Sequence, residues 1–380
     1  MIYLDNNATT AVAPEVAAVM NSVLGGAVGN PSSAHAAGRA ARRIVDHARE
    51  QTAALLGAAS PGEIVFTSGG SEADNTAILS ALTEAPHKKH IVTTRVEHEA
   101  VRKPIEHLER EGYRVSWIDV DQGGNLDVEA FEAALAAETV LVSVMLANNE
   151  TGVLFPVEKL SQIAKSRTRA LFHVDGVNAA GKVRIDLQNS AIDLFSISAH
   201  KFHGPKGAGA LYIRDGVGVR PMLVGGGQES GRRAGTEAVH QIAGLGAAAE
   251  FAAALDDMSR VRELRDRLEF GILNKIPNSR LNGTSDPATR LANTTNISFE
   301  NLNGEMILDR LDGVGVCVST GSACNAENHT ASPVLRAMDV PYSWAMGSIR
   351  FSLGRFNTAD EIDRVLDELP TIIENLRLFA

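Results

Sequence analysis

The stretch EIVFTSGGSEADNTAILSAL, residues 63–82, decides the fold because it joins a strand to a helix through a glycine turn. Its first five residues are mostly apolar or β-branched and predict a short buried strand. Gly69 and Gly70 allow a tight turn, and Ser71 and Glu72 are typical of the first turn of a helix. A strand that leads directly into a helix is the repeating unit of α/β folds.

The same alternation continues on both sides of this stretch. A helix is predicted from residue 35 to Gly57, where glycine ends it. Further short buried strands, most of them separated by helical segments, are predicted at 90–94, 114–120, 139–146, 169–174, 192–198 and 208–213. This order predicts an α/β fold with a mostly parallel sheet covered by helices on both faces. Such sheets bind ligands at the carboxyl ends of their strands.

The pattern changes after a predicted helix near residues 237–257. A long amphipathic helix, a strand, a helix, two strands and a last helix are then predicted at 258–276, 292–299, 304–313, 314–319, 348–353 and 358–376. We therefore expect two domains. Residues 14–257 form the larger α/β domain, and residues 1–13 join residues 258–380 in a smaller α+β domain.

The composition is that of an ordinary globular protein, with 380 residues, 44% of them hydrophobic and 22% charged. A net charge of −10 gives no reason to expect nucleic acid or an anionic membrane as a partner. The N-terminus MIYLDNNATT lacks the features of a signal peptide, and no apolar run is long enough to span a bilayer. We expect a cytoplasmic protein.

The two cysteines are too few for a disulfide framework and fit a reducing compartment. Their C-x6-C spacing has no second ligand pair nearby, so no metal site is predicted. Cys317 belongs to the predicted strand 314–319, where a buried structural residue is expected. Cys324 lies among Ser, Gly and Ala in STGSACNA, residues 319–326, and its local sequence leaves open an incidental loop cysteine or a functional thiol.

Three polar features come at predicted strand ends. Ser71 opens a helix after the glycine turn, where free N–H groups favour an anion such as a phosphate, although simple helix capping explains the same pattern. Asp175 ends an apolar strand, where a carboxylate points at a ligand crevice or caps the next segment. Lys201 lies between an apolar strand and a Gly/Pro-rich turn. A lysine beside an anion site is a candidate for Schiff-base chemistry, whereas a lone loop lysine is usually solvated.

Taken together, these features favour one cofactor. Pyridoxal 5'-phosphate needs a phosphate anchor, an acid partner for its pyridine nitrogen and a lysine that forms an imine. The sequence therefore predicts a pyridoxal-phosphate site at the carboxyl ends of the strands.

Motifs in order along nearly the whole chain resemble the cysteine desulfurases of the NifS/IscS group, which are fold-type I pyridoxal-phosphate enzymes of the class-V aminotransferase type. The matching motifs are YLDNNATT (3–10), GNPSSAH (29–35), SGGSEADN (68–75), EHEAV (97–101), NNETG (148–152), HVDGVNAAGK (173–182), SAHKFHGPKG (198–207), GRRAGTE (231–237), STGSAC (319–324) and IRFSLGRF (349–356). The wording of several motifs is closest to the nitrogen-fixation type, NifS. The chain also ends soon after its last predicted helix, without the extended tail that IscS-type members use toward a scaffold partner.

This resemblance implies a role for each matching residue. Lys201 would form the Schiff base, and Asp175 would keep the pyridine nitrogen protonated. His98 would stack over the ring and act as a catalytic residue that shuttles protons. The remaining cofactor contacts would come from Gly70, Ser71, Asn149, Asn178, Ser198 and His200, and from Thr236 of the other subunit of a homodimer. Asn30 and Arg350 would bind the substrate carboxylate, and Cys324 would accept the sulfur. Arg350 as a structural ion-pair residue and His98 as a structural histidine are the alternatives, and His35, His173 and His203 are expected to be structural or supporting.

One residue departs from the pattern of the group. Relatives usually have Gln where this chain has Asn178, which is one methylene shorter. The contact with the phenolic oxygen of the cofactor would then be direct, pass through water, or be lost.

The resemblance implies that L-cysteine is converted to L-alanine and a persulfide on Cys324, with the sulfur passed to a scaffold protein for iron–sulfur cluster assembly, including assembly for nitrogenase. A selenocysteine lyase or another β-eliminating enzyme of the same fold would share Lys201 and Asp175. A sulfur-relay protein without turnover would not need them. A thiol hydrolase built on Cys324 would need an oriented His/Cys pair that the sequence does not reveal.

Overall fold

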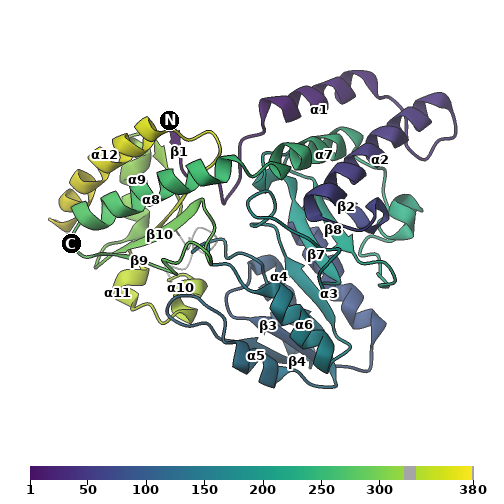
Figure 1. Ribbon diagram of the computed structural model, residues 1–380, viewed down its shortest axis with the longest axis horizontal. Coiled ribbons are helices and arrows are strands. Elements are labelled where there is room, and N and C mark those ends of the chain that lie inside the picture. Colours follow the sequence, from purple (N-terminus) through teal and green to yellow (C-terminus); the bar gives the residue numbers. More distant parts are fainter. Residues whose placement is uncertain (321–330, 379–380) are drawn as a thin grey trace.

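The computed structural model describes residues 1–320 and 331–378. It has two lobes, with the large sheet in one and the C-terminal helices in the other (Figure 1). The N-terminus lies in the same lobe as the C-terminal helix α12. Cys324, the predicted sulfur acceptor, lies outside the described residues.

The larger lobe is built on a seven-stranded sheet of order β2-β8-β7-β6-β5-β3-β4. Its strands are β2 (Ile64–Thr67), β3 (His90–Thr94), β4 (Arg114–Ile118), β5 (Thr139–Ser143), β6 (Leu171–Asp175), β7 (Leu194–Ser198) and β8 (Gly209–Ile213). Only β8 runs against its neighbours, so the carboxyl ends of β2, β7, β6, β5, β3 and β4 meet at one edge. The mostly parallel sheet is thus confirmed.

Helices cover both faces of this sheet, as predicted. They are α1 (Pro14–Gly26), α2 (Ala36–Leu56), α3 (Gly70–Glu84), α4 (Glu99–Arg110), α5 (Val128–Ala134), α6 (Val157–Arg167) and α7 (Val239–Ala253). On one face, α3 and α4 pack against alternate strand residues such as Val65, Ile91 and Leu141. On the other, α2 and α7 pack together against residues that include Phe66 and Phe195 (Figure 1). This alternation is the period-two pattern of strands buried on both faces.

Three short 3₁₀ helices complete this lobe: η1 (Pro61–Glu63), η2 (Ala199–Lys201) and η3 (Gln228–Gly231). Of these, η2 follows directly on β7 and brings Lys201 to the carboxyl edge of the sheet. The C-terminal glycine of α2 is confirmed, because Gly57 has the left-handed φ of 57° that glycine adopts without strain.

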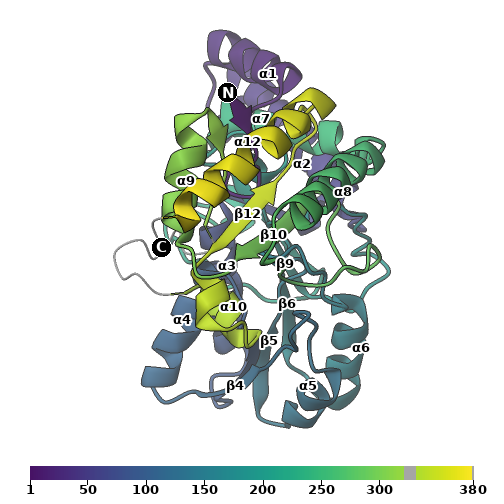
Figure 2. The same ribbon diagram turned by 90° about the vertical axis from the view of Figure 1, so that its left-hand side faces the viewer.

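The second lobe contains a three-stranded antiparallel sheet and a two-stranded one. Its elements are α8 (Asp257–Lys275), β9 (Ser279–Leu281), β10 (Thr294–Phe299), α9 (Gly304–Gly313), β11 (Val316–Cys317), α10 (Pro333–Ala337), α11 (Tyr342–Ala345), β12 (Ser348–Ser352) and α12 (Ala359–Arg377). Strand β1 (Ile2–Tyr3) pairs with β11, and the order of the larger sheet is β12-β10-β9. In Figure 2, α12, α9 and α8 lie on the outer side of this sheet.

The second lobe has its own apolar core, which includes Ile2 and Leu4 from the N-terminus. The two ends of the chain therefore fold together. The boundaries at residues 14 and 257 stay a prediction.

Several sequence expectations need correction. Strand β4 is not fully buried, because it lies at the edge of the sheet, where Arg114 is exposed. Strand β5 ends at Ser143 rather than at residue 146. Cys317 is half-buried rather than buried, because β11 is only two residues long and pairs on one side with β1. Strands β1 and β9 were too short for their sequence pattern to predict.

Candidate active site

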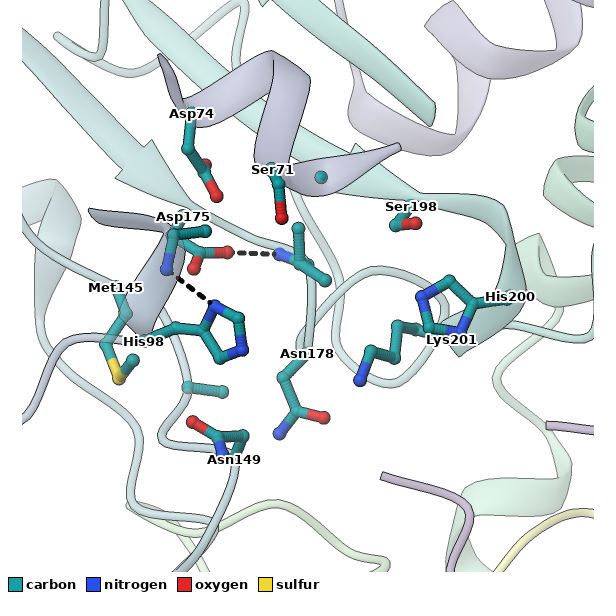
Figure 3. A pocket seen from close by; sticks show the side chains of 14 residues that line it. Ser71, Asp74, His98, Met145, Asn149, Asp175, Asn178, Ser198, His200 and Lys201 are labelled. Carbon is teal, nitrogen blue, oxygen red and sulfur yellow. Dashed lines mark hydrogen bonds between the residues drawn. The ribbon is translucent and has the colours of Figure 1, made fainter. Parts of the chain in front are cut away.

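A cavity of about 200 Å³ lies at the carboxyl edge of the large sheet. We call it the inner cavity. It is lined by Gly70, Ser71, Asp74, His98, Ala100, Met145, Ala147, Asn149, Asp175, Val177, Asn178, Ser198, His200 and Lys201. In Figure 3, Asp175 and His98 lie on one side of it, and Lys201 and His200 on the other. The structure thus brings together nine of the predicted cofactor residues.

Lys201 is positioned by the turn that follows β7. Its Nζ donates to the main-chain oxygens of Asn7 and Ala8, the latter at 3.1 Å. These two residues belong to the N-terminal segment, which crosses from the smaller lobe. The amine therefore lies where the two lobes meet, and it points into the inner cavity (Figure 3).

Asp175 is the last residue of β6, and its carboxyl faces the cavity from the opposite side. Its side chain is only 6% exposed, and its Oδ1 accepts a hydrogen bond of 2.9 Å from the N–H of Val177. Burial and the neighbouring Asp74 raise the pKa of Asp175 to about 6. A cation placed against this carboxylate would favour its charged form.

The N-terminus of α3 opens onto the same cavity through Gly70 and Ser71. A Cβ on Gly70 would come within 2.7 Å of a methyl group of Val177, so only glycine leaves this turn unobstructed. Ser198 and His200 line the cavity beside this turn. Burial lowers the pKa of His200 to about 4, which leaves a neutral ring that can donate or accept a hydrogen bond. Backbone N–H groups at a helix start with a nearby hydroxyl fit a phosphate.

His98 is the N-cap of α4, and its Nδ1 accepts a hydrogen bond of 3.1 Å from the N–H of Ala100. This bond fixes the ring, whose other edge faces the cavity (Figure 3). The protein around the ring desolvates it and lowers the pKa of His98. Such a neutral ring is suited to stacking against a planar group.

Asn178 keeps its place in the inner cavity despite its short side chain. Its Oδ1 accepts a hydrogen bond of 3.0 Å from Nζ of Lys182, and its Nδ2 lies 3.4 Å from the main-chain oxygen of Asn148. Burial and the charge of Lys201 lower the pKa of Lys182 well below the usual lysine value. The contacts with Lys182 and Asn148 hold the amide of Asn178 at the cavity wall.

A second cavity of about 310 Å³ adjoins the first and shares His98, Asn149 and Lys201 with it. We call it the outer cavity. Arg350, on β12, is its main buried cation and is 6% exposed. Its Nη2 lies 2.7 Å from Oδ1 of Asp5, and its Nη1 donates to the main-chain oxygen of Asn149 at 3.1 Å. The Nε of Arg350 is buried without a hydrogen-bond partner in the described structure.

The aminotransferase class-V family model matches residues 2–365. The chain belongs to the class-V aminotransferases. Within this family it is 52% identical over its whole length to cysteine desulfurase 2 of Trichormus variabilis, of which it covers 95%. It is also 48% identical to the cysteine desulfurase NifS of Azotobacter vinelandii, with 99% of this chain and 93% of that protein covered. The sequence-based assignment to the cysteine desulfurase group is confirmed.

Solved structures agree with this class-V aminotransferase in fold. A NifS-like protein superimposes with a TM-score of 0.92 at 37% identity, covering 99% of this chain and all of the other. A protein named SspA, solved in complex with cysteine, gives a TM-score of 0.82 at 33% identity over 94% of this chain and all of the other. The fold-type I architecture predicted from the sequence is thereby confirmed.

Two residues assigned by the resemblance lie outside both cavities of this class-V aminotransferase, and a third is not described. Thr236 is exposed and lines a separate hollow with Thr67 and Arg233. Asn30 is exposed, and its Oδ1 accepts a hydrogen bond from the N–H of Ser32 at 2.9 Å; it lines neither the inner nor the outer cavity. Cys324 lies outside the described residues. The roles of all three stay predictions.

Several residues that line the cavities were not predicted from the sequence to have a role. Asp74 is the most polar of those in the inner cavity, where Met145, Ala147 and Val177 are also new. In the outer cavity, burial raises the pKa of Glu97 to about 8 and that of Glu150 to about 7. The burial of Asp74 could have been predicted from the helical periodicity of the sequence. Asp74 shares one helix face with Ile78 and Ala81, which are four and seven residues further on and fully buried.

Proposed function

We propose that this protein is a pyridoxal-phosphate-dependent cysteine desulfurase that converts L-cysteine to L-alanine and forms a persulfide on Cys324. One observation carries the proposal: Lys201 and a buried carboxyl, Asp175, face each other across a cavity that opens beside Arg350. Sequence similarity to proteins named cysteine desulfurase, over nearly the whole chain, supports the proposal.

The residues of the inner cavity fit pyridoxal 5'-phosphate. The helix start at Gly70 and Ser71, with Ser198 and His200, would hold the phosphate. Asp175 would hold the pyridine nitrogen, since a buried carboxyl with a raised pKa gains from a cationic neighbour. When bound, the cofactor supplies an electron-withdrawing ring that stabilises negative charge on the α-carbon of an amino acid.

The ring and the substrate would be oriented by side chains that line both cavities. His98 would stack on one face of the ring, and Asn149 and the amide of Asn178 would contact its edge. Arg350 would bind the carboxylate of L-cysteine, because its Nε is an unsatisfied donor and its guanidinium plane suits a carboxylate. Asn30 is a second proposed carboxylate contact.

Lys201 would act as the general base for the α-proton of the substrate. Its Nζ is already held at the junction of the two cavities by main-chain oxygens of Asn7 and Ala8. Because Lys201 and Arg350 line the same cavity, a base held in this way would lie close to the α-carbon of an amino acid whose carboxylate is on Arg350. The same amine would return the proton later in the reaction.

The sulfur step balances without an external oxidant or reductant. The thiolate of Cys324 attacks the substrate sulfur, an S–S bond forms, and the Cβ–S bond breaks with its electron pair left on the carbon. That carbon takes up a proton, so L-cysteine and an enzyme thiol become L-alanine and an enzyme persulfide. Thiolate, not thiol, is the attacking form.

Three further parts of the proposal concern partners and compartment. We infer a homodimer, in which Thr236 would contact the phosphate of the other subunit. The persulfide sulfur would pass to a scaffold protein that assembles iron–sulfur clusters, including those needed for nitrogen fixation, in the cytoplasm. Among the described residues, no helix is long and apolar enough to cross a membrane.

The test is to follow alanine and persulfide formation from L-cysteine by the purified yellow protein, beside Cys324→Ala and Cys317→Ala. Cys317→Ala is the matched control, since it removes the other thiol. We expect alanine and persulfide in the parent and in Cys317→Ala, and loss of the persulfide in Cys324→Ala. A persulfide that survives in Cys324→Ala would refute the role of that residue.

The products also separate the competing activities. Pyruvate and ammonia in place of alanine would indicate a β-eliminating lyase. Faster turnover of selenocysteine than of cysteine, with no dependence on Cys324, would indicate a selenocysteine lyase. A protein that stays colourless with added cofactor would refute pyridoxal-phosphate chemistry altogether and favour a relay protein or a thiol hydrolase.

A further inference from the structure

Asp74 is a buried carboxyl in the wall of the inner cavity that the proposed reaction does not use. It lies in the second turn of α3 and is 1% exposed. Its Oδ1 has no hydrogen-bond partner in the described structure. The nearest ionisable nitrogen is Nε2 of His173, at 3.5 Å, which is too far for a good hydrogen bond.

A row of polar side chains crosses the sheet beneath Asp74. The Nδ1 of His173, on β6, lies 2.9 Å from the hydroxyl of Ser143 on β5, and its Nε2 lies 3.0 Å from the hydroxyl of Ser196 on β7. His173 is fully buried, and burial lowers its pKa to about 4. The ring is therefore neutral at physiological pH and does not balance the charge of a carboxylate.

Asp74 and Asp175 lie in the same buried region, and Figure 3 shows both above His98. Two carboxyl groups that share a dry site do not both ionise, because each charge opposes the other. Asp175 has a main-chain donor that stabilises its charge, the N–H of Val177 at 2.9 Å. Asp74 has only the hydroxyl of Ser196, and burial raises its pKa to about 7.

We propose that Asp74 is a positioning residue that carries a proton, so that the single negative charge of this wall stays on Asp175. As a neutral acid, Asp74 can donate a hydrogen bond to an acceptor in the polar row. As a carboxylate it can only accept, and its Oδ1 then stays without a partner. It follows that one carboxylate, that of Asp175, faces the ring nitrogen of the cofactor, and this consequence rests on the proposed function. The proton on Asp74 itself does not.

The sign of the pH dependence follows from the surroundings of Asp74. His173 and Asp175 face it from β6, and Glu97 and His98 belong to the turn before α4. An acid whose pKa is raised on folding destabilises the folded state increasingly as pH climbs from its unfolded toward its folded value. Asp74→Asn, which has the shape of the neutral acid, removes this destabilisation.

The experiment is thermal unfolding of the full chain, freed of cofactor, across a pH series for the parent and Asp74→Asn. We expect the difference in melting temperature, variant minus parent, to increase between about pH 5 and about pH 8. Asp119→Asn is the control, because that carboxyl is mostly exposed. A difference that stays flat or falls with pH would overturn the proposal, since an ionised, well-paired Asp74 would lose stability on this substitution.

A second measurement uses pyridoxal 5'-phosphate as the probe and follows its visible absorbance during titration. Asp74→Asn should bind within about threefold of the parent, whereas Asp175→Asn should bind at least about tenfold more weakly, as expected for loss of a charged hydrogen bond. Equal weakening in both variants would overturn the division of charge. If the parent itself failed to bind the cofactor, the proposed function would fall, while the unfolding series would still decide where the proton lies.

Discussion

The inner and outer cavities share three residues but differ in the kind of polar group that they leave without a partner. The wall of the inner cavity holds Asp74 and Asp175, and in the described part of the chain neither pairs with a lysine or arginine. The outer cavity holds Arg350, whose Nε has no partner. Of the acids that line it, Asp5 pairs with Arg350 and Glu99 pairs with Arg102. The other two, Glu97 and Glu150, have raised pKa values of about 8 and about 7 and are at most partly ionised near pH 7.

This difference indicates what each cavity is built to hold. Buried charges are retained in proteins when something compensates them, and a ligand does so as well as a side chain. The inner cavity is complementary to a cation such as a protonated ring nitrogen, and the outer cavity to an anion such as a carboxylate. Lys201 lies at their junction, where a molecule that joins the two charges would react.

The most severe way to break this comparison is Asp175→Asn. The substitution keeps the shape of the side chain and removes its charge. We expect alanine formation to fall about 100-fold or more, as when one preorganised electrostatic contact is removed from a transition state. The measurement is initial alanine production at saturating L-cysteine.

The loss should not come from unfolding. Because the folded-state pKa of Asp175 is raised to about 6, its charge destabilises the folded protein above that pH, and a neutral Asn does not. With both proteins freed of cofactor, the melting temperature of the variant near pH 8 should therefore equal or exceed that of the parent. Activity within about tenfold of the parent, a smaller effect than one such contact gives, would mean that the charge of Asp175 is not used.

The sequence predicted the inner cavity well, because strand ends and helix starts are local features. Ser198 ends β7 and Lys201 follows it, Asp175 ends β6, and Gly70 begins α3, so a parallel sheet brings them to one edge without further information. The antiparallel β8 was not foreseen, since its short apolar run, 209–213, has the same pattern in either direction.

The outer cavity could not be derived from pattern alone. Its central contact joins Asp5 to Arg350, and it depends on how the N-terminal segment crosses to β12. Asn7 likewise bonds Thr294, on β10, through its Nδ2 at 2.9 Å. Such pairings between distant segments depend on tertiary packing, and here only the family resemblance assigned Arg350 a role.

Changing Arg350 breaks the other half of the comparison, with a smaller expected effect. Arg350→Ala should raise KM for L-cysteine about 10- to 100-fold, the scale of a lost hydrogen bond to a charged group, with a lesser change in kcat. Arg350→Lys should recover only part of the loss, because an ammonium lacks the planar fork. Steady-state kinetics with L-cysteine check both variants.

Arg102→Ala is the matched control for this prediction. Arg102 lines the same outer cavity, but it already pairs with Glu99 at 3.0 Å and with Glu106. Its removal should leave KM nearly unchanged. An equal rise in KM for both alanine variants would attribute binding to the general positive charge of the cavity rather than to Arg350.

Asp5→Asn sharpens the comparison by the smallest change, because it alters how Arg350 is held without removing it. Asp5 fixes one end of the guanidinium at 2.7 Å, and Asn149 fixes the other through its main-chain oxygen, which leaves Nε free. A neutral amide accepts a weaker hydrogen bond from arginine than a carboxylate does, so KM should rise about threefold with kcat nearly constant. Asp312→Asn, on the exposed end of α9, removes the same charge as a control. A fall in KM would mean that Asp5 competes with the substrate carboxylate for Arg350 instead of orienting it.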